Sequence, residues 1–291
     1  MNHVPVTNTF RYDRRIVVLA TKHGKERAIS RPFAAALGAR VTVPPDLDTD
    51  ILGTFTGEVP RIGSPKEVAL RKARLGIQLC GQPLGLASEG SFGPHPQIPW
   101  VYANLELLVF VDEELGLELT ETLFTRDTNF GHCNARNLEE AKEFFEGARF
   151  PSHGLIVRPN DRVEANLLFK GILDLPTVAS AIARCAAVSA DGLAHIETDM
   201  RAHMNPTRRM AIRRVAFRLA RRIATVCPAC GAPGWGIEDT ERGLPCEECG
   251  APTELVRFEL FCCWRCSHVE RKPRRDGRQY AERRDCPACN P

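Results

Sequence analysis

The sequence contains no apolar run that approaches the roughly 20 residues needed to span a bilayer. Residues 1–15 are polar and lack the apolar segment of a signal peptide. These two absences argue against a membrane partner and against secretion, so we expect a cytoplasmic protein. Because thiols stay reduced in the cytoplasm, paired cysteines there indicate a metal site rather than a disulfide.

The chain also lacks a strong net charge and low-complexity tracts. Its formal charge is +3 over 291 residues, which identifies no class of partner. Basic residues concentrate in one place, residues 201–222, where no acidic residue occurs. Apolar positions recur there at helical spacing, so we expect an amphipathic helix with a solvated arginine face; a nucleic-acid footprint is the alternative. The expected apolar face is Ile212, Val215, Ala216, Leu219 and Ile223, and the expected exposed face is Arg214, Arg218, Arg221 and Arg222.

Cysteine is abundant at one end of the chain. Nine of the twelve cysteines lie in the last 65 residues, and eight of them form four Cys-x-x-Cys pairs. The pairs are Cys227/Cys230, Cys246/Cys249, Cys263/Cys266 and Cys286/Cys289. The gaps of 15 residues between the first two pairs and 19 between the last two are typical of four-thiolate zinc sites. We therefore expect two zinc ions in a double zinc ribbon over residues 226–291, with sequential pairing favoured over a cross-braced arrangement.

The expected zinc ions are structural, because four cysteines leave no open coordination position for a substrate. Cys262 is surplus to the two sites and could be a free thiol or an alternative ligand. We expect the tail's aromatic residues to cover the metal sites, with stacking on nucleic-acid bases as the alternative. They are Trp235, Phe258, Phe261 and Trp264. Eight thiolates with two zinc ions carry a formal charge of −4, so charge alone does not predict nucleic-acid binding by the ribbons.

Between residues 15 and 225, short apolar runs alternate with helical patterns, which is typical of an α/β domain. Strands are expected at residues 16–20, 40–43, 84–87, 105–111, 117–119, 155–157, 165–169 and 194–197. Helices are expected at residues 25–37, 65–81, 137–148, 177–188 and from 206 onward. A hairpin turn is expected at 112–116, a loop at 88–96 and a flexible N-terminus at 1–14. The chain thus divides into residues 1–14, 15–225 and 226–291.

Four polar clusters lie where strands end or helices begin, the places where α/β sheets usually bind ligands. They occupy residues 21–25, 67–73, 87–92 and 197–209. The first is a strand-to-helix turn that suits a phosphate, and the third presents Glu89 just beyond a buried strand, as a metal ligand would be. Each cluster also has a structural interpretation, which for the first is an ordinary helix start, where lysine and glycine are common. Glu67 fits a helix capping box, the third cluster fits a surface loop, and His203 fits a buried hydrogen-bonded histidine.

Taken in order, the four clusters resemble the motifs of the inosine/xanthosine triphosphate pyrophosphatase family. That family has Ala-Thr-x-Asn-x-x-Lys, then Glu-Asn-Ala-x-x-Lys-Ala, then Asp-Ser-Gly-Leu, then Ser-His-Arg. This chain has Ala20-Thr21 with Lys25, Glu67-Val-Ala-x-x-Lys72-Ala73, Ser88-Glu89-Gly90-Ser91-Phe92 and Asn205-Pro-Thr207-Arg208. Ser88 stands where the family has one of its paired acids, and the histidine of Ser-His-Arg is absent.

The resemblance implies that residues 15–225 form a mixed-sheet, pyrophosphatase-like α/β domain that hydrolyses a nucleoside triphosphate with Mg²⁺. Water would attack the α-phosphorus and release pyrophosphate, while the metal offsets the developing charge. The implied catalytic residues are Glu67, Glu89 and Lys72, and the implied magnesium ligands are Glu67 and Glu89. Glu197 or Asp199 would supply a further carboxylate, with Asp199 as our choice. The implied substrate contacts are Thr21, His23, Lys25, Ser91, His203, Thr207 and Arg208.

The whole chain also resembles a bacterial family known only as a domain of unknown function, through residues 88–96 and 197–208. That resemblance implies no activity. The alternative to a hydrolase is therefore a non-catalytic nucleotide- or nucleic-acid-binding protein with a zinc ribbon. The sequence leaves the oligomeric state open.

Overall fold

The structure is a computed structural model that describes residues 11–45, 63–95 and 98–290. The described residues form two compact units, one within residues 14–219 and the other from Ala220 on, to which residues 11–13 also belong. We call the first the α/β unit and the second the tail. No helix in the described part of the chain is long and apolar enough to cross a membrane.

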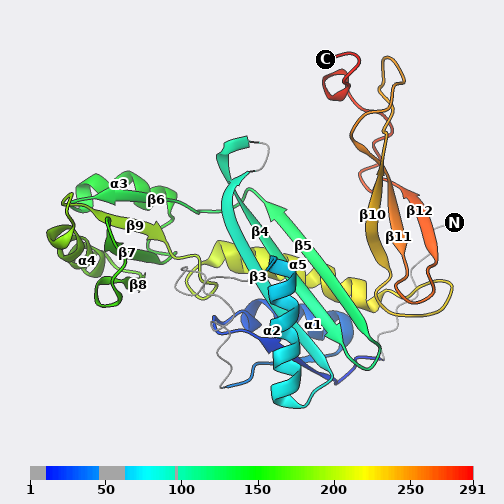
Figure 1. Cartoon of the computed structure of the whole chain (residues 1–291), viewed down its shortest axis with the longest axis horizontal. Coiled ribbons are helices and arrows are strands. Elements are labelled where there is room, and N and C mark those ends of the chain that lie inside the picture. Colours follow the sequence, from blue (N-terminus) through cyan, green and yellow to red (C-terminus); the bar gives the residue numbers. More distant parts are fainter. Residues whose placement is uncertain (1–10, 46–62, 96–97, 291) are drawn as a thin grey trace. The chain divides into compact units, whose positions relative to one another are not determined.

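The α/β unit begins with a mixed five-stranded sheet in the order β2-β1-β3-β4-β5, of which Figure 1 labels β3, β4 and β5. Its strands are β1 (Ile16–Ala20), β2 (Arg40–Thr42), β3 (Leu84–His95), β4 (Ile98–Asp112) and β5 (Leu117–Thr125). β1 pairs in parallel with β2 and β3, whereas β4 pairs antiparallel with both β3 and β5. The turn at residues 113–116 joins β4 to β5. The expected mixed-sheet α/β class is confirmed.

Two helices cover opposite faces of this sheet. α2 (Pro65–Cys80) packs Ala69 and Ala73 into a buried cluster with Leu107 of β4. Successive side chains of a strand point to opposite faces of the sheet. Phe110, three residues after Leu107, therefore lies on the face opposite to α2, where it contacts Phe33 of α1 (Glu26–Leu37). The sequence anticipates the ends of both helices, because left-handed glycines follow them at 38 and 81, and the Ser64–Glu67 capping box opens α2.

β3 is longer than the sequence predicts. The expected loop at residues 88–96 is wrong for residues 88–95, because β3 pairs with β4 as far as Pro94 opposite Tyr102 and His95 opposite Ile98. Its Gly, Ser and Pro residues look loop-like, yet the hairpin with β4 provides partners for the backbone along the whole strand. β1 ends opposite Ala87, so in the described structure residues 88–95 of β3 have a strand partner on one side only.

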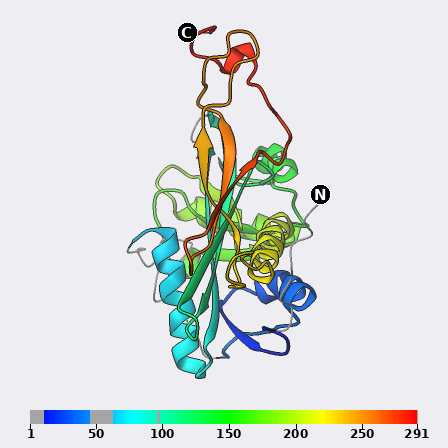
Figure 2. The same cartoon turned by 90° about the vertical axis from the view of Figure 1, so that its right-hand side faces the viewer.

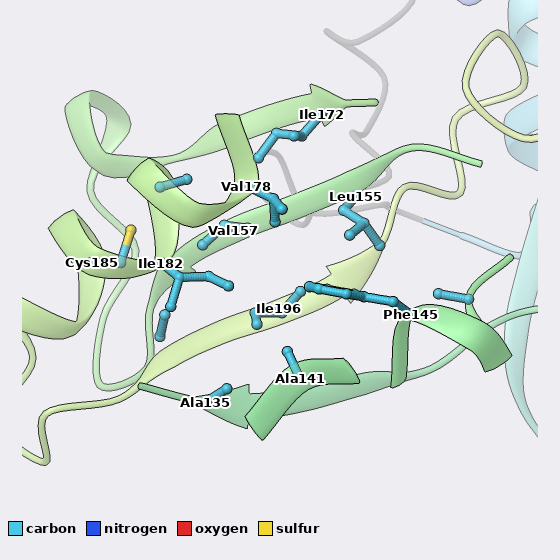
Figure 3. Packing of buried hydrophobic residues seen from close by; sticks show 13 residues of the cluster. Ala135, Ala141, Phe145, Leu155, Val157, Ile172, Val178, Ile182, Cys185 and Ile196 are labelled. Atoms are coloured by element: carbon cyan, nitrogen blue, oxygen red, sulfur yellow. The ribbon is translucent and has the colours of Figure 1, made fainter. Parts of the chain in front are cut away.

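A second sheet follows in the same unit, antiparallel and four-stranded, in the order β6-β9-β7-β8. Its elements are β6 (His132–Ala135), α3 (Leu138–Gly147), β7 (Leu155–Pro159), β8 (Phe169–Ile172), α4 (Leu175–Val188) and β9 (Ala194–Thr198). Figure 3 shows the core between this sheet and its helices, where Phe145 of α3 and Ile182 of α4 pack against Ile196 of β9.

Two details of this sheet differ from the sequence prediction. Residues 165–167 form a short 3-10 turn closed by the Leu167 amide donating to the Glu164 carbonyl at 3.0 Å, so the strand predicted from residue 165 begins at Phe169 instead. β6 has no sequence counterpart, because its four residues, His-Cys-Asn-Ala, show no apolar alternation. Its pairing with β9 defines it.

The long helix α5 (Pro206–Ala224) buries all five apolar residues expected on its core face. Arg214, Arg218 and Arg221 are exposed, as expected. The prediction for Arg222 is wrong, because this side chain is 8% exposed, donates to the Gly234 carbonyl at 3.3 Å and pairs with Glu238. A side chain at Gly236 would lie 3.0 Å from the Arg222 guanidinium, so a glycine here lets the chain pass close to the end of the helix.

The tail contains a three-stranded antiparallel sheet of β10 (Gly236–Arg242), β11 (Val256–Cys262) and β12 (Val269–Pro273). Figure 2 shows these strands together with the C-terminal segment and its 3-10 helix at Arg283–Asp285. All four Cys-x-x-Cys pairs lie outside the strands, in the turns that precede and follow them.

Candidate functional site

The eight paired cysteines form two groups of four sulfur atoms. One group is Cys227, Cys230, Cys263 and Cys266, and the other is Cys246, Cys249, Cys286 and Cys289. Sulfur atoms of facing pairs are 3.7 Å apart in the first group and 3.7 to 3.9 Å apart in the second. Tetrahedral zinc with Zn–S bonds of about 2.3 Å requires S···S separations of about 3.8 Å, whereas a disulfide requires about 2.05 Å. The donor set and its spacing therefore fit a zinc ion in each group.

The cysteine pairs are interleaved, so the sequential pairing favoured by the spacing is wrong: the first pair joins the third and the second joins the fourth. The strands explain this arrangement. β10 separates the first pair from the second by seven residues of extended chain, about 23 Å at 3.3 Å per residue. β11 returns antiparallel, with Cys262 opposite Gly236, and brings the third pair back to the first; β12 then runs out again toward the second pair.

Tight backbone turns hold the cysteines. In the first two pairs the amide of the residue after the second cysteine, Gly231 or Gly250, donates to the carbonyl of the first cysteine at 2.9 and 3.0 Å. Both glycines have φ near 70°, a conformation that glycine adopts without strain. After the third pair Ser267 takes the left-handed conformation instead, and Asn290 donates to Cys286 in the fourth. Different residues thus follow the second cysteine of each pair in these turns.

Two of the eight paired thiols have a lowered pKa. Burial opposes ionisation of Cys263 and Cys286, but N–H groups and neighbouring thiols more than offset it and lower the pKa of each to about 7. Thiolates are the species that bind zinc. Trp235 covers the first group, packed with Cys227 and Cys263 in one buried cluster, as expected for a cover rather than a base-stacking platform. Cys262 belongs to neither group.

A second candidate site, in the α/β unit, is a set of buried charged side chains beside the end of β1. Lys25, at the turn after β1, donates to the Ser88 carbonyl of β3 at 2.5 Å and lies 3.5 Å from the Ser88 hydroxyl. Lys25 can reach this carbonyl because β1 has ended one residue earlier in the register. Burial, and then repulsion by Arg208, lowers the pKa of Lys25 from 10.5 to about 8.

Two further cations lie in the same region, each paired with a buried carboxylate. Lys72 of α2 donates to Glu89 at 2.6 Å, and Arg208 of α5 donates to Glu106 of β4 at 2.8 Å. The four side chains are at most 9% exposed. Lys25 interacts electrostatically with all four, so the five groups form one cluster of three cations and two carboxylates. We call it the ion cluster.

Sequence reasoning missed Glu106. The signal was a single acid inside an apolar run, Leu-Glu-Leu-Leu-Val-Phe, which a buried strand tolerates only if the charge has a partner. That partner, Arg208, is 102 residues away, so the pairing was not visible in the sequence. Glu106 lies opposite Gly90 and Glu89 opposite Leu107, so the two carboxylates project from opposite faces of the sheet.

The structure brings most of the predicted substrate residues to the ion cluster or its neighbourhood. Thr21 is buried, and its hydroxyl accepts from the His23 amide at 3.4 Å. His23 stacks on His203 at 5.6 Å between ring centroids. Thr207 contacts His153 Nε2 at 2.9 Å, beside Arg208 on α5, whereas Ser91 is exposed on β3.

The three predicted magnesium ligands do not form a group. Glu67 is exposed and accepts hydrogen bonds from the Ser64 amide and hydroxyl, which lower its pKa. Asp199 is fully buried and paired with Arg201 at 2.6 Å, while Glu89 is paired with Lys72. Among the described residues, the two cysteine groups are the sets of three or more metal-ligating side chains close enough to share an ion.

Comparison with known proteins places the chain in a family. Residues 72–291 match the model of a family described as Domain of unknown function (DUF6671), and the chain belongs to that family. No curated protein matches the chain. The matched region contains Lys72, Glu89, Glu106, Arg208 and both cysteine groups, but begins after Lys25. Because the family's description names no activity, any function must be argued from the geometry.

Proposed function

We propose that the α/β unit binds a nucleoside triphosphate and hydrolyses it, with Mg²⁺, to the nucleoside monophosphate and pyrophosphate, and that the tail is a structural zinc-binding appendage. The observation that supports this proposal is the composition of the ion cluster. The cluster contains three buried cations and two buried carboxylates, so it carries one positive charge in excess. Uncompensated buried charge is costly, and a phosphate group would neutralise it.

The position of the ion cluster, like its charge, suits the binding of a phosphate. Ligands of α/β sheets bind beyond the carboxyl ends of parallel strands, and Lys25 follows the end of β1, which is parallel to β3. The resemblance to the pyrophosphatase motifs rests on the same residues, since Lys25, Lys72 and Glu89 all belong to the cluster. The fold and the motifs thus point to the same place in the chain.

The metal would be held by Glu89 together with the substrate. Proteins commonly bind Mg²⁺ through one or two carboxylates, with phosphate oxygens and water completing the octahedron, so a preformed group of three acids is not required. Lys72, now paired with Glu89, would contact the phosphate when Glu89 holds the metal. The metal would supply charge stabilisation to the phosphoryl group under attack.

The test is pyrophosphate release from a panel of nucleoside triphosphates, measured on the full chain with Mg²⁺ and with Mn²⁺. Turnover should fall at least about 100-fold in Glu89→Gln, because a carboxylate that binds the metal contributes several kcal/mol to the transition state. Glu118→Gln is the matched control: Glu118 is a half-exposed glutamate of β5 paired with Arg74 and should leave turnover unchanged. Absence of turnover with every nucleotide would refute hydrolysis.

A second candidate is a non-catalytic nucleotide-binding protein, and one observation favours it. Glu89 and Glu106 both already accept from cations, and Glu67 is engaged at its helix cap, which is a stable arrangement without metal. In that case nucleotide would raise the melting temperature of Glu89→Gln as much as that of the wild type, and this shift would require Arg208. Nucleic-acid binding by the tail is less favoured, since its basic side chains pair with acids, as in Arg271–Glu241 and Arg275–Glu259.

A further inference from the structure

Two buried oxygen atoms on β4 accept no hydrogen bond from any described residue. They are Oδ1 of Asn104 and Oε2 of Glu106, in side chains that are 1% and 0% exposed. The other oxygen of Glu106 accepts from Arg208 at 2.8 Å. Buried acceptors without donors are rare and costly, because they give up hydrogen bonds to water and regain none. Their presence indicates a ligand that supplies donors.

The strand register places these two side chains on one face of the sheet. Asn104 and Glu106 are two residues apart, so both lie on the face of the sheet opposite to α2. Their neighbours across the ladder on β3 are Phe92 and Gly90. A side chain at Gly90 would come within 2.9 Å of the Glu106 carboxylate and would also meet the Arg208 guanidinium, so the glycine leaves the space that the pair occupies.

Aromatic rings adjoin the same place. Phe92, opposite Asn104, lies under the Arg208 guanidinium at 5.1 Å and stacks against Phe130 at 5.9 Å. Tyr102, the next residue of β4 on this face, contacts Phe130 edge-on at 5.1 Å and is 40% exposed. The face therefore passes from buried charges at Glu106, through Asn104, to partly exposed rings.

We propose that Asn104 Oδ1 and Glu106 Oε2 recognise the base of the substrate, by accepting hydrogen bonds from a ring N–H and a neighbouring exocyclic amine, as on guanine, while Phe92 and Tyr102 contact its flat surface. This inference rests on the proposed function and names the substrate class of that site. Two acceptor oxygens of the protein favour a base whose edge carries two adjacent hydrogen-bond donors. Adenine carries a ring nitrogen acceptor beside its amine, so this nitrogen and a protein oxygen would repel each other.

A divalent cation is the other ligand that oxygen atoms could take. The Arg208 guanidinium disfavours a divalent cation here, because the guanidinium already donates to the Glu106 carboxylate and would repel a second positive charge. An uncharged N–H donor meets no such repulsion. The aromatic rings also favour a planar ligand, since stacking on a base stabilises binding and metal ligation makes no use of rings.

The experiment measures affinities of the full chain for the α,β-methylene analogues of GTP, ITP and ATP and for inorganic tripolyphosphate. The GTP analogue should bind about tenfold more tightly than the ITP analogue, which lacks the exocyclic amine, and more tightly still than the ATP analogue. Asn104→Leu should abolish the preference for guanine over hypoxanthine and leave tripolyphosphate affinity unchanged. Asn134→Leu, at an exposed asparagine of β6, is the matched control and should change neither.

The outcomes separate this inference from the function on which it rests. Equal affinities for the three analogues, with tripolyphosphate bound, would overturn base recognition and leave phosphate binding intact. Binding of neither analogues nor tripolyphosphate would overturn both. A melting temperature raised by Mg²⁺ alone in the wild type, but not in Asn104→Leu, would show that these oxygens hold a cation instead. Should Asn104→Leu fail to fold, Asn104→Ser and the wild-type preference between the GTP and ITP analogues decide the question.

Discussion

The tail and the α/β unit bury different kinds of side chain. From Cys227 onward the buried apolar residues are Cys227, Ala232, Trp235, Leu244, Cys246, Cys263, Ala281 and Cys286, half of them cysteines. The α/β unit instead buries large side chains such as Phe33, Phe110 and Ile196. A small module rarely buries enough apolar surface to fold by that means, so we expect the tail to depend on metal at its two cysteine groups, where the larger unit depends on its cores.

Exposed ion pairs occur in both regions, but the described pairs whose two side chains are both almost fully buried lie in the α/β unit. In the α/β unit the pairs Lys72–Glu89 and Arg208–Glu106 are almost fully buried, whereas tail pairs such as Arg242–Glu254 are 68% and 84% exposed. Exposed pairs contribute little to stability, because water and salt screen the attraction and both side chains lose conformational freedom when they pair. Buried pairs cost desolvation and must be justified by packing or by function. The comparison therefore directs the search for chemistry to the α/β unit.

Disrupting zinc binding should separate the two regions most clearly. Apparent zinc affinities in small zinc modules correspond to about 10–16 kcal/mol, far more than any single contact in the α/β unit. If the pairs interleave, Cys227→Ser/Cys263→Ser disrupts one site and should retain about one zinc, because Cys246, Cys249, Cys286 and Cys289 form the other. Cys227→Ser/Cys246→Ser disrupts both sites and should retain none. Metal content per chain checks both predictions.

Sequential pairing would give the reverse result, with zinc retained in the second variant and lost in the first. Cys262→Ser is the control, because Cys262 belongs to neither group, and it should retain two zinc ions. Hydrogen exchange read by mass spectrometry should show loss of protection in residues 227–290 and unchanged protection in the strands of the α/β unit. Loss of protection throughout the chain would contradict the division between the two regions.

Disrupting an ion pair should have a smaller effect on stability than disrupting zinc binding. Arg208→Met leaves Glu106 buried without its cation and should lower the free energy of unfolding by about 3–5 kcal/mol. Glu254→Gln, in an exposed pair of the tail, should change it by about 0–1 kcal/mol. Urea unfolding of each variant against the wild type measures both values. Equal effects would mean that burial does not distinguish the pairs.

Lys25 gives the α/β unit a pH dependence. Its pKa is about 8 in the folded chain, against 10.5 for an ordinary lysine. Between these values the unfolded chain binds a proton that the folded chain does not, so stability rises with pH across this window, by up to about 3 kcal/mol. Below pH 8 the lysine is charged in both states and the cost of burying it is present in full.

The measurement is urea unfolding of the wild type and of Lys25→Met at pH 7.5, 9 and 10.5. Other groups titrate in both chains, so the difference between the two isolates Lys25. That difference should move in favour of the wild type as the pH rises. A difference that is constant with pH would show that Lys25 is not held in a buried site.

The smallest effect concerns the core of the four-stranded sheet. Ile196→Val removes one methylene group from a fully buried side chain of β9 and should cost about 0.5–1.5 kcal/mol. Zinc content should not change, since the tail does not use this core. An effect on metal content comparable to that of a cysteine variant would break the comparison between the two regions.

Local features were the part of this structure that the sequence predicted well. The caps at Ser64 and Asn137 and the glycine after α1 depend on residues within one helical turn, so a local sequence pattern is enough to indicate them. The eight paired cysteines were recognisable as candidate metal ligands because each pair occupies one tight turn. Each of these predictions needed no knowledge of distant contacts.

What the sequence could not predict depended on which strands pair. The interleaving of the cysteine pairs follows from β10 and β11 running antiparallel, and the length of β3 follows from its hairpin with β4. Glu106 acquires its partner Arg208 only when α5 covers β4. Arg222 looked solvent-exposed because the pattern of one helix cannot show the segment that folds back over its end. Non-local pairing thus limited both the fold and the site.

The interleaved cysteines also set the order in which the tail can mature during synthesis. A growing chain that has emerged as far as residue 262 carries the first members of both sites and can close neither. Under sequential pairing it would already hold one complete zinc site. The second group is complete only once Cys286 and Cys289 have been synthesised. A chain truncated before these residues would keep Cys246 and Cys249 without their partner cysteines, as thiols that can be oxidised or can bind another metal.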